Sequence, residues 1–170
     1  MNKKDCDGCS VTILCDSWNF DSSLQSLIQK VITETYRNHS NISSTRWVVA
    51  LILADDNFVR SYNRKYRGKD LPTNVLSFPQ IVNKTEGNHY WPFNEPLELG
   101  DIMIAYETVC REANEAGISI RQHLIHLIVH GFLHILGYGH DCDDETIEMR
   151  RLEVAGLASV GFPDPYKGHL

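Results

Sequence analysis

Nothing in the 170-residue sequence is long and apolar enough to cross a bilayer. The longest uncharged apolar run, residues 47–54, falls far short of the roughly 20 residues that a membrane-spanning helix needs. Lys3 and Lys4 are not followed by the apolar stretch of a signal peptide, and the chain shows no repeat or low-complexity segment. We therefore expect a soluble cytoplasmic protein that does not act at a membrane.

The five cysteines, an odd number, do not fit a disulfide framework. Cys6 and Cys9 form a CxxC pair, but no second pair follows at the spacing of a zinc ribbon. We interpret all five as reduced thiols, with a redox or metal role for Cys6 and Cys9 as the less favoured alternative.

A strong excess of either charge is also missing. The chain has 16 Lys and Arg against 22 Asp and Glu, and its 42% hydrophobic content excludes a disordered or fibrous protein. The net charge of -6 argues mildly against nucleic acid as a partner, but residues 60–70 hold five cations and one anion. The sequence therefore predicts a basic strip on an acidic body, and RNA binding with a shallow salt dependence.

Hydrophobic periodicity and helix caps predict four strands and five helices. We expect strands at 11–15, 47–53, 74–78 and 102–104, helices at about 21–37, 56–67, 106–116, 119–136 and 143–158, and a surface loop at 80–98. Strict βαβ alternation is absent, which favours one small α+β domain over residues 1–170, with 1–9 as a flexible extension.

Four of the eight histidines share one face of the predicted helix at 119–136, namely His123, His126, His130 and His134. His130 and His134 are one turn apart, and Gly137 can leave the helix with a positive φ and bring His140 back over its end. Three imidazoles with an open fourth position are typical of catalytic zinc. We interpret His123 as a core residue whose hydrogen bonds are satisfied. His126 has two equally favoured interpretations, which are support of a ligand and packing in the core.

The spacing of the three histidines is that of the metzincin peptidases, except that Gly131 replaces their glutamate general base. Without that group ordinary proteolysis is disfavoured. A phosphodiester needs less help from a protein acid when a metal ion and an arginine stabilise the transition state.

The basic strip contains the candidate arginine. Arg60 and Lys65 fit a solvated helix face, whereas Arg67 ends the helix beside Gly68, where its side chain can turn into a cleft and bind phosphate. Tyr62 and Tyr66 could stack on unpaired bases.

Four segments carry a recognisable pattern, namely residues 66–79 (YRGKDLPTNVLSFP), 100–102 (GDI), 130–140 (HGFLHILGYGH) and 161–166 (GFPDPY). Together they resemble the YbeY family of bacterial metal-dependent endoribonucleases of ribosomal RNA maturation. The resemblance implies a compact α+β fold with a small mixed sheet and about five helices. It also implies one Zn²⁺ held by His130, His134 and His140, and a functional role for Arg67. The family commonly has aspartate where this chain has Gly139, which would weaken metal binding unless Asp141 compensates.

These observations predict a single-strand-specific zinc endoribonuclease acting in 16S ribosomal RNA processing and ribosome quality control. The expected partners are single-stranded or ribosomal RNA, small-subunit components and assembly factors, but not DNA. Two candidates are kept for the general base, namely the metal-activated hydroxide itself and a nearby group such as Asp101. The alternatives are a zinc-dependent peptidase or amidohydrolase, and a non-enzymatic zinc-containing ribosome assembly factor.

Overall fold

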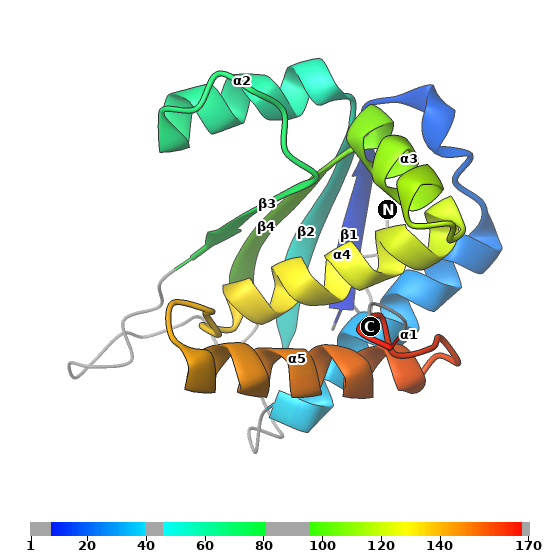
Figure 1. Ribbon diagram of the computed structural model, residues 1–170, viewed down its shortest axis with the longest axis vertical. Helices are drawn as coiled ribbons and strands as arrows, with labels where there is room; N and C mark the ends of the chain where they lie inside the picture. Colours follow the sequence, from blue (N-terminus) through cyan, green and yellow to red (C-terminus); the bar gives the residue numbers. More distant parts are fainter. Residues whose placement is uncertain (1–7, 40–45, 81–95, 168–170) are drawn as a thin grey trace.

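A computed structural model describes residues 8–39, 46–80 and 96–167 of the protein. Over these residues the chain forms four strands, five α-helices and one 3₁₀ turn (Figure 1). In chain order they are β1 (Gly8–Ile13), the 3₁₀ turn (Asp16–Trp18), α1 (Ser22–His39), β2 (Trp47–Ala54), α2 (Asp56–Arg67), β3 (Val75–Pro79), β4 (Leu97–Ala105), α3 (Tyr106–Glu115), α4 (Ile120–Ile135) and α5 (Asp143–Ala158).

The four strands form one mixed sheet in the order β1-β2-β4-β3. β2 is parallel to both β1 and β4, and β3 is antiparallel to β4 at the edge of the sheet. The predicted α+β fold with a small mixed sheet is therefore confirmed.

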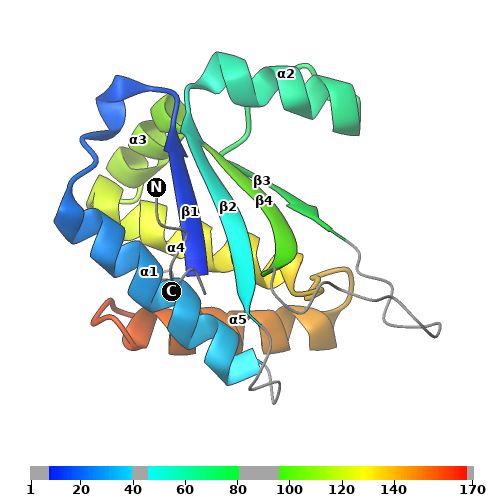
Figure 2. The same ribbon diagram turned by 180° about the vertical axis from the view of Figure 1, so that it is seen from behind.

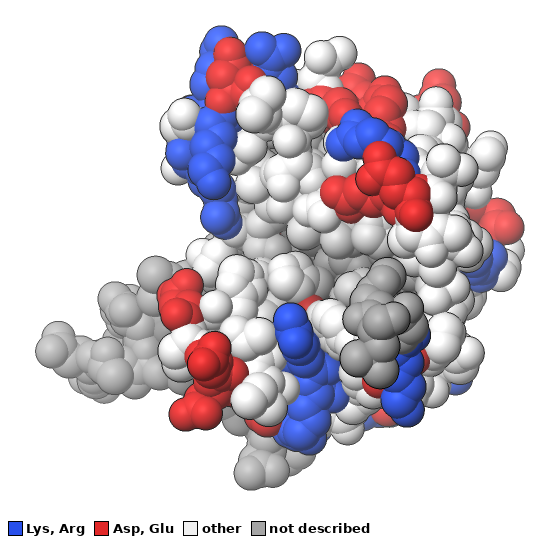
Figure 3. All heavy atoms as spheres, viewed as in Figure 1, with Lys and Arg blue, Asp and Glu red and all other residues white. Residues whose placement is uncertain are grey.

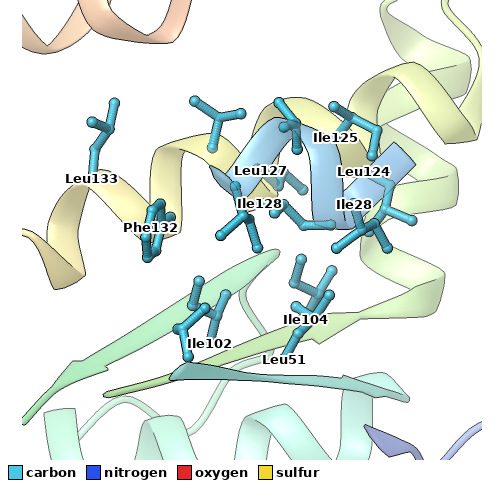
Figure 4. Close-up of a cluster of buried hydrophobic side chains, with 14 of the residues drawn as sticks. Ile28, Leu51, Ile102, Ile104, Leu124, Ile125, Leu127, Ile128, Phe132 and Leu133 are labelled. Carbon is cyan, nitrogen blue, oxygen red and sulfur yellow. The ribbon is translucent and has the colours of Figure 1, made fainter. Parts of the chain in front are cut away.

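One face of the sheet carries the main core, because alternate residues of a strand point to the same face. Leu51 on β2 and Ile102 and Ile104 on β4 are fully buried there against α1 and α4 (Figure 4). Each such side chain contributes roughly 1.5–3 kcal/mol to folding. α5 packs on the outside of α1 and α4 (Figure 1). The histidine helix α4 is thus held between the sheet and α5.

The opposite face of the sheet packs against α2. Val59 of α2 is buried in a small cluster with Leu76, Met103 and Ala105 from the strands. Figure 2, which views the molecule from behind, shows α2 lying across one end of the sheet. Because Arg67 is the last residue of α2, this packing fixes where the candidate arginine lies.

Two strands, β1 and β4, differ by more than one residue from the bounds predicted for them. β4 begins at Leu97 and has nine residues, so the expected loop ends before Glu98; residues 81–95 of that loop lie outside the described residues. β1 begins at Gly8 and ends at Ile13, so residues 8 and 9 of the expected extension belong to the sheet. Gly8, Cys9 and Ser10 belong to the strand because their backbone groups pair with those of β2. The composition of this segment does not indicate such a pairing.

The cysteines of the described residues are free thiols, at positions 9, 15, 110 and 142, while Cys6 lies outside the described residues. Burial raises the pKa of the Cys9 thiol to about 12, so this cysteine is protonated and unreactive at neutral pH. In the same described ranges, none of the helices combines the length and the apolarity that a bilayer span requires.

Candidate metal centre

The three histidines predicted as ligands lie together at the end of α4. A ligand nitrogen of each of His130, His134 and His140 lies within 4.8 Å of those of the other two. The Nε2 atoms of His130 and His134 are 3.1 Å apart. Ser119 begins the helix as predicted, since its side chain accepts the Gln122 backbone N–H.

The turn after α4 brings His140 to the other two histidines. Gly137 has a φ of +94°, in the left-handed region that favours glycine. Its N–H donates to the His134 carbonyl, and the next N–H, of Tyr138, donates to the Leu133 carbonyl. The predicted role of Gly137 is therefore confirmed, and the ring of His140 lies 5.2 Å from that of His134.

Hydrogen bonds to the Nδ1 atoms determine which nitrogens face the centre. His134 Nδ1 lies 3.0 Å from the Tyr138 carbonyl, and His130 Nδ1 lies 2.6 Å from Glu153 Oε1. A carbonyl and an ionised carboxylate only accept, so both Nδ1 atoms are protonated and, in the neutral rings, both Nε2 atoms present lone pairs. Two nitrogens bound to one tetrahedral zinc ion lie about 3.4 Å apart. The Nε2 atoms of His130 and His134 are 3.1 Å apart, so their separation fits the binding of one shared cation.

Glu153 contacts the candidate metal centre, and sequence reasoning missed it. Its side chain is only 1% exposed, and it accepts hydrogen bonds from His130 and from the Tyr166 hydroxyl. Burial raises the pKa of this carboxyl, but the nearby His126, His130 and Tyr166 lower it further, to about 2, so it is ionised. The sequence offered one indication of this role, because Glu153 is a charged residue next to Leu152 on the side of α5 that is buried.

The two remaining histidines of α4 differ in their surroundings. His123 Nε2 lies 2.7 Å from Glu112 Oε2, so its interpretation as a satisfied residue is confirmed. His126 Nε2 lies 3.7 Å from Glu153 Oε2, too far for a hydrogen bond, and is a buried nitrogen with no hydrogen-bond partner among the described residues. His126 therefore lies beside the carboxylate that orients His130.

Gly131 allows α4 to approach the sheet closely. A Cβ atom at this position would lie 2.9 Å from Ser77 Oγ and 3.1 Å from side-chain carbons of Val75 and Ile102. The Ser77 hydroxyl donates to the Gly131 carbonyl at 2.9 Å. A glutamate at this position would therefore point into packed side chains instead of the metal centre.

Asp101, named above as a possible general base, belongs to the other side of the sheet. Ile102 and Ile104 face α4, whereas Met103 and Ala105 pack with α2. Since strand side chains alternate, Asp101 points to the α2 face, away from the three histidines. That candidate is therefore wrong.

Gly139 has an acidic neighbour in Glu145 of α5. Glu145 Oε2 accepts the Asp141 N–H at 3.2 Å and lies 3.3 Å from where a Cβ at position 139 would be. The side chain that fills this space is therefore that of Glu145, and not that of Asp141.

An open cleft of about 360 Å³ joins the histidines to the basic strip. His130 and His134 form one side, β3 forms the floor, and the exposed Arg67 lies at the rim. Burial lowers the pKa of His134, helped by His130, His140 and the charge of Arg67, so its imidazole is neutral and able to bind a metal.

The cleft is bordered by opposite charges. Lys and Arg gather on α2 in Figure 3, while acidic side chains cluster across the recess at the start of α5. Those acidic residues are Asp143, Asp144 and Glu145. A polyanion would therefore be attracted to the α2 side of the cleft.

Converging histidines that could hold a metal ion, in a cleft with an arginine at its rim, are an arrangement typical of metal-dependent hydrolases. Residues 12–161 match the family model described as endoribonuclease YbeY. The chain is 42% identical to the endoribonuclease YbeY of Rhodopseudomonas palustris over 93% of this chain and 80% of that protein. It is also 42% identical to that of Bradyrhizobium diazoefficiens, over 92% of this chain and 83% of that one. The chain therefore belongs to the endoribonuclease YbeY family.

The fold is also found in a solved structure, the solution structure of TM1509 from Thermotoga maritima. The two chains match with a TM-score of 0.51 at 19% identity, over 93% of this chain and 99% of that one. At this identity the match establishes the shared fold alone.

Proposed function

We propose that this protein is a zinc-dependent endoribonuclease that cuts single-stranded RNA. We further propose that it acts in the cytoplasm, on the 16S ribosomal RNA and with small-subunit components and assembly factors, and that residues 1–170 form one functional unit. The observation that supports this most directly is the three-histidine cluster facing Arg67 across a cleft, in a chain of the endoribonuclease YbeY family.

His130, His134 and His140 would hold one Zn²⁺ ion, through Nε2 in the case of His130 and His134. A zinc ion bound by three histidines supplies Lewis acidity and lowers the pKa of water to about 7. Glu153 and the Tyr138 carbonyl hold two of the rings in the required orientation.

Arg67 would bind the scissile phosphate and stabilise the negative charge that develops on its non-bridging oxygens. The guanidinium suits this role because it is always charged and can bind two phosphate oxygens at once. Its position at the exposed end of α2, beside the cleft, leaves it free to reach a bound strand.

A preference for unpaired RNA is supported by the aromatic side chains of α2. The rings of Tyr62 and Tyr66 are stacked with centroids 5.8 Å apart, and Tyr66 is 55% exposed. An exposed aromatic ring beside a phosphate-binding arginine offers a stacking surface to bases that are not paired.

Peptide hydrolysis is opposed by the packing of Gly131, which leaves no room for the glutamate base of the metzincins. Fluorogenic peptides assayed beside a single-stranded RNA would separate the two activities. We expect RNA cleavage only. A non-enzymatic assembly factor would cleave neither substrate, and its folded metal-site variants would still support ribosome assembly.

His130→Ala should lose bound metal and RNA cleavage together, because it removes one of the three ligands. Elemental analysis and cleavage of a labelled single-stranded RNA measure both. Retention of a full metal complement would contradict the assignment of His130 as a ligand.

Arg67→Glu should keep the metal but lose cleavage by at least about 100-fold, the scale of one preorganised electrostatic contact. Arg60→Glu is the matched control, since Arg60 lies on the same helix and pairs with Asp70 at 2.9 Å. Normal cleavage by the Arg67 variant would refute its role at the phosphate.

A further inference from the structure

A second cavity lies beside the metal centre, at the first half of α4. It has a volume of about 610 Å³ and is enclosed by the turn between α3 and α4, by α4 itself and by the segment that follows α5. This size falls within the roughly 300–1,000 Å³ of small-molecule sites. None of the proposed metal ligands lines it.

The lining combines apolar walls with groups that can form hydrogen bonds. Ile118 and Leu157 contribute apolar surface, and Tyr166 contributes an aromatic ring. Gln122 contributes a side-chain amide and His126 contributes an imidazole ring whose Nε2 atom is buried toward Glu153. The amide can both donate and accept hydrogen bonds, as the edge of a nucleobase does.

The cavity and the metal centre are joined by one side chain. Glu153 accepts a hydrogen bond from His130 and another from the Tyr166 hydroxyl, and it lies 3.7 Å from His126. His126 and His130 lie one turn apart, about 6 Å along the helix axis.

Two cations and one anion lie at the border of the cavity. Lys167 and Asp164 are among its lining residues, and the Arg150 guanidinium lies 5.0 Å from the centroid of the Tyr166 ring. An aromatic ring flanked by cations suits a base and its phosphate better than it suits an uncharged peptide segment.

We propose that this cavity binds one nucleobase of the RNA strand whose backbone lies in the metal cleft. The base stacks on Tyr166 between the apolar walls, and its edge forms hydrogen bonds with the side-chain amide of Gln122. This inference rests on the proposed function, because an RNA strand reaches the cavity only if RNA is the substrate of the neighbouring cleft. Reading an unpaired base by stacking and edge contacts is how proteins recognise single-stranded RNA.

Two variants of the full-length, zinc-loaded protein test the cavity. Gln122→Ala removes an edge contact and Ile118→Trp fills the space; neither residue belongs to the proposed catalytic machinery. Gln25→Ala, at an exposed position of α1, is the matched control. Kinetics on a single-stranded RNA should give a KM about tenfold higher for both cavity variants, with zinc content and kcat unchanged.

Binding of the four ribonucleoside 5′-monophosphates, followed by NMR, tests the cavity without any cleavage. At least one should shift the side-chain amide signals of Gln122 in the unmodified protein, and Ile118→Trp should abolish its binding. If the unmodified protein cleaves RNA while both variants keep its KM and no nucleotide binds at Gln122, the cavity proposal is wrong and the proposed function stands. If the protein cleaves no RNA, the proposed function fails, and nucleotide binding at Gln122 alone decides whether the cavity accepts a base.

Discussion

At the scale of single residues, the metal centre depends on which nitrogen each ring presents. Glu153 and the Tyr138 carbonyl fix His130 and His134 by their Nδ1 atoms. The hydroxyl of Tyr138 lies 2.7 Å from His39 Nδ1, which anchors this turn to α1. The ligand geometry is therefore held by residues that do not themselves touch the proposed ion.

Glu153→Gln tests that support directly. The variant removes the negative charge from the carboxylate that orients His130, so the affinity for zinc should fall about 10- to 100-fold. Competition with a chromophoric chelator measures this affinity. Glu148→Gln is the control on the same helix, because Glu148 is exposed and pairs with Arg151 at 2.7 Å. Equal zinc affinity in both variants and the unmodified protein would exclude a supporting role for Glu153.

The same carboxylate predicts how the stability of the metal-free protein depends on pH. Its pKa is about 2 in the folded protein against an ordinary value of 4.5, so the folded state binds fewer protons than the unfolded state between these values. The free energy of unfolding is therefore highest above pH 4.5 and falls as the pH drops toward 2. Urea unfolding across this range should show a weaker pH dependence for Glu153→Gln. An identical slope would contradict the ionised, buried carboxylate.

At the scale of elements, the site exists because α4 lies tightly on β3 and β4. Gly131→Ala should destabilise the protein by about 1–3 kcal/mol, because the added methyl group meets Ser77, Val75 and Ile102 at 3.1 Å or less. Urea unfolding measures the change. Gly139→Ala serves as the control, since its methyl group would meet only the flexible end of Glu145. A Gly131 variant as stable as this control would show that the approach of α4 is not tight.

Sequence periodicity predicted the helices well, and it placed His130, His134 and Gly137 because their spacing along one helix is a local property. What it missed depends on pairing between distant segments. Gly8 joins the sheet through Val48, and β4 gains residues 97–101 through β2 and β3. Glu153 belongs to the metal centre only because α5 packs on α4, a contact that no local pattern encodes.

The error on Asp101 has a different cause. Its position next to a strand was predicted, but the face to which it points depends on which neighbours of the strand pack against α4. Alternation alone gives two equivalent faces, and tertiary packing selects one of them.

At the scale of the whole molecule, the net charge of -6 is divided between a basic helix and an acidic body. Of the five cations at 60–70, Arg60 is paired with Asp70, which leaves Arg64, Lys65, Arg67 and Lys69 to meet phosphates. These four cations should give single-stranded RNA binding a log–log salt slope of about -3, at about 0.7 per phosphate contact, and contacts from Arg150 and Lys167 at the cavity would take the slope to about -4. Fluorescence anisotropy at several salt concentrations measures this slope. A much steeper slope would require a second basic surface.

The central claim is that three histidines hold a zinc ion on which RNA cleavage depends. The most direct test measures zinc content and cleavage of a single-stranded RNA in the same sample, before chelation, after chelation and after zinc is returned. We predict one zinc ion per chain, loss of cleavage when it is removed, and recovery when it is restored, with no recovery in His130→Ala. Cleavage that continues at its original rate in metal-free protein would contradict the claim.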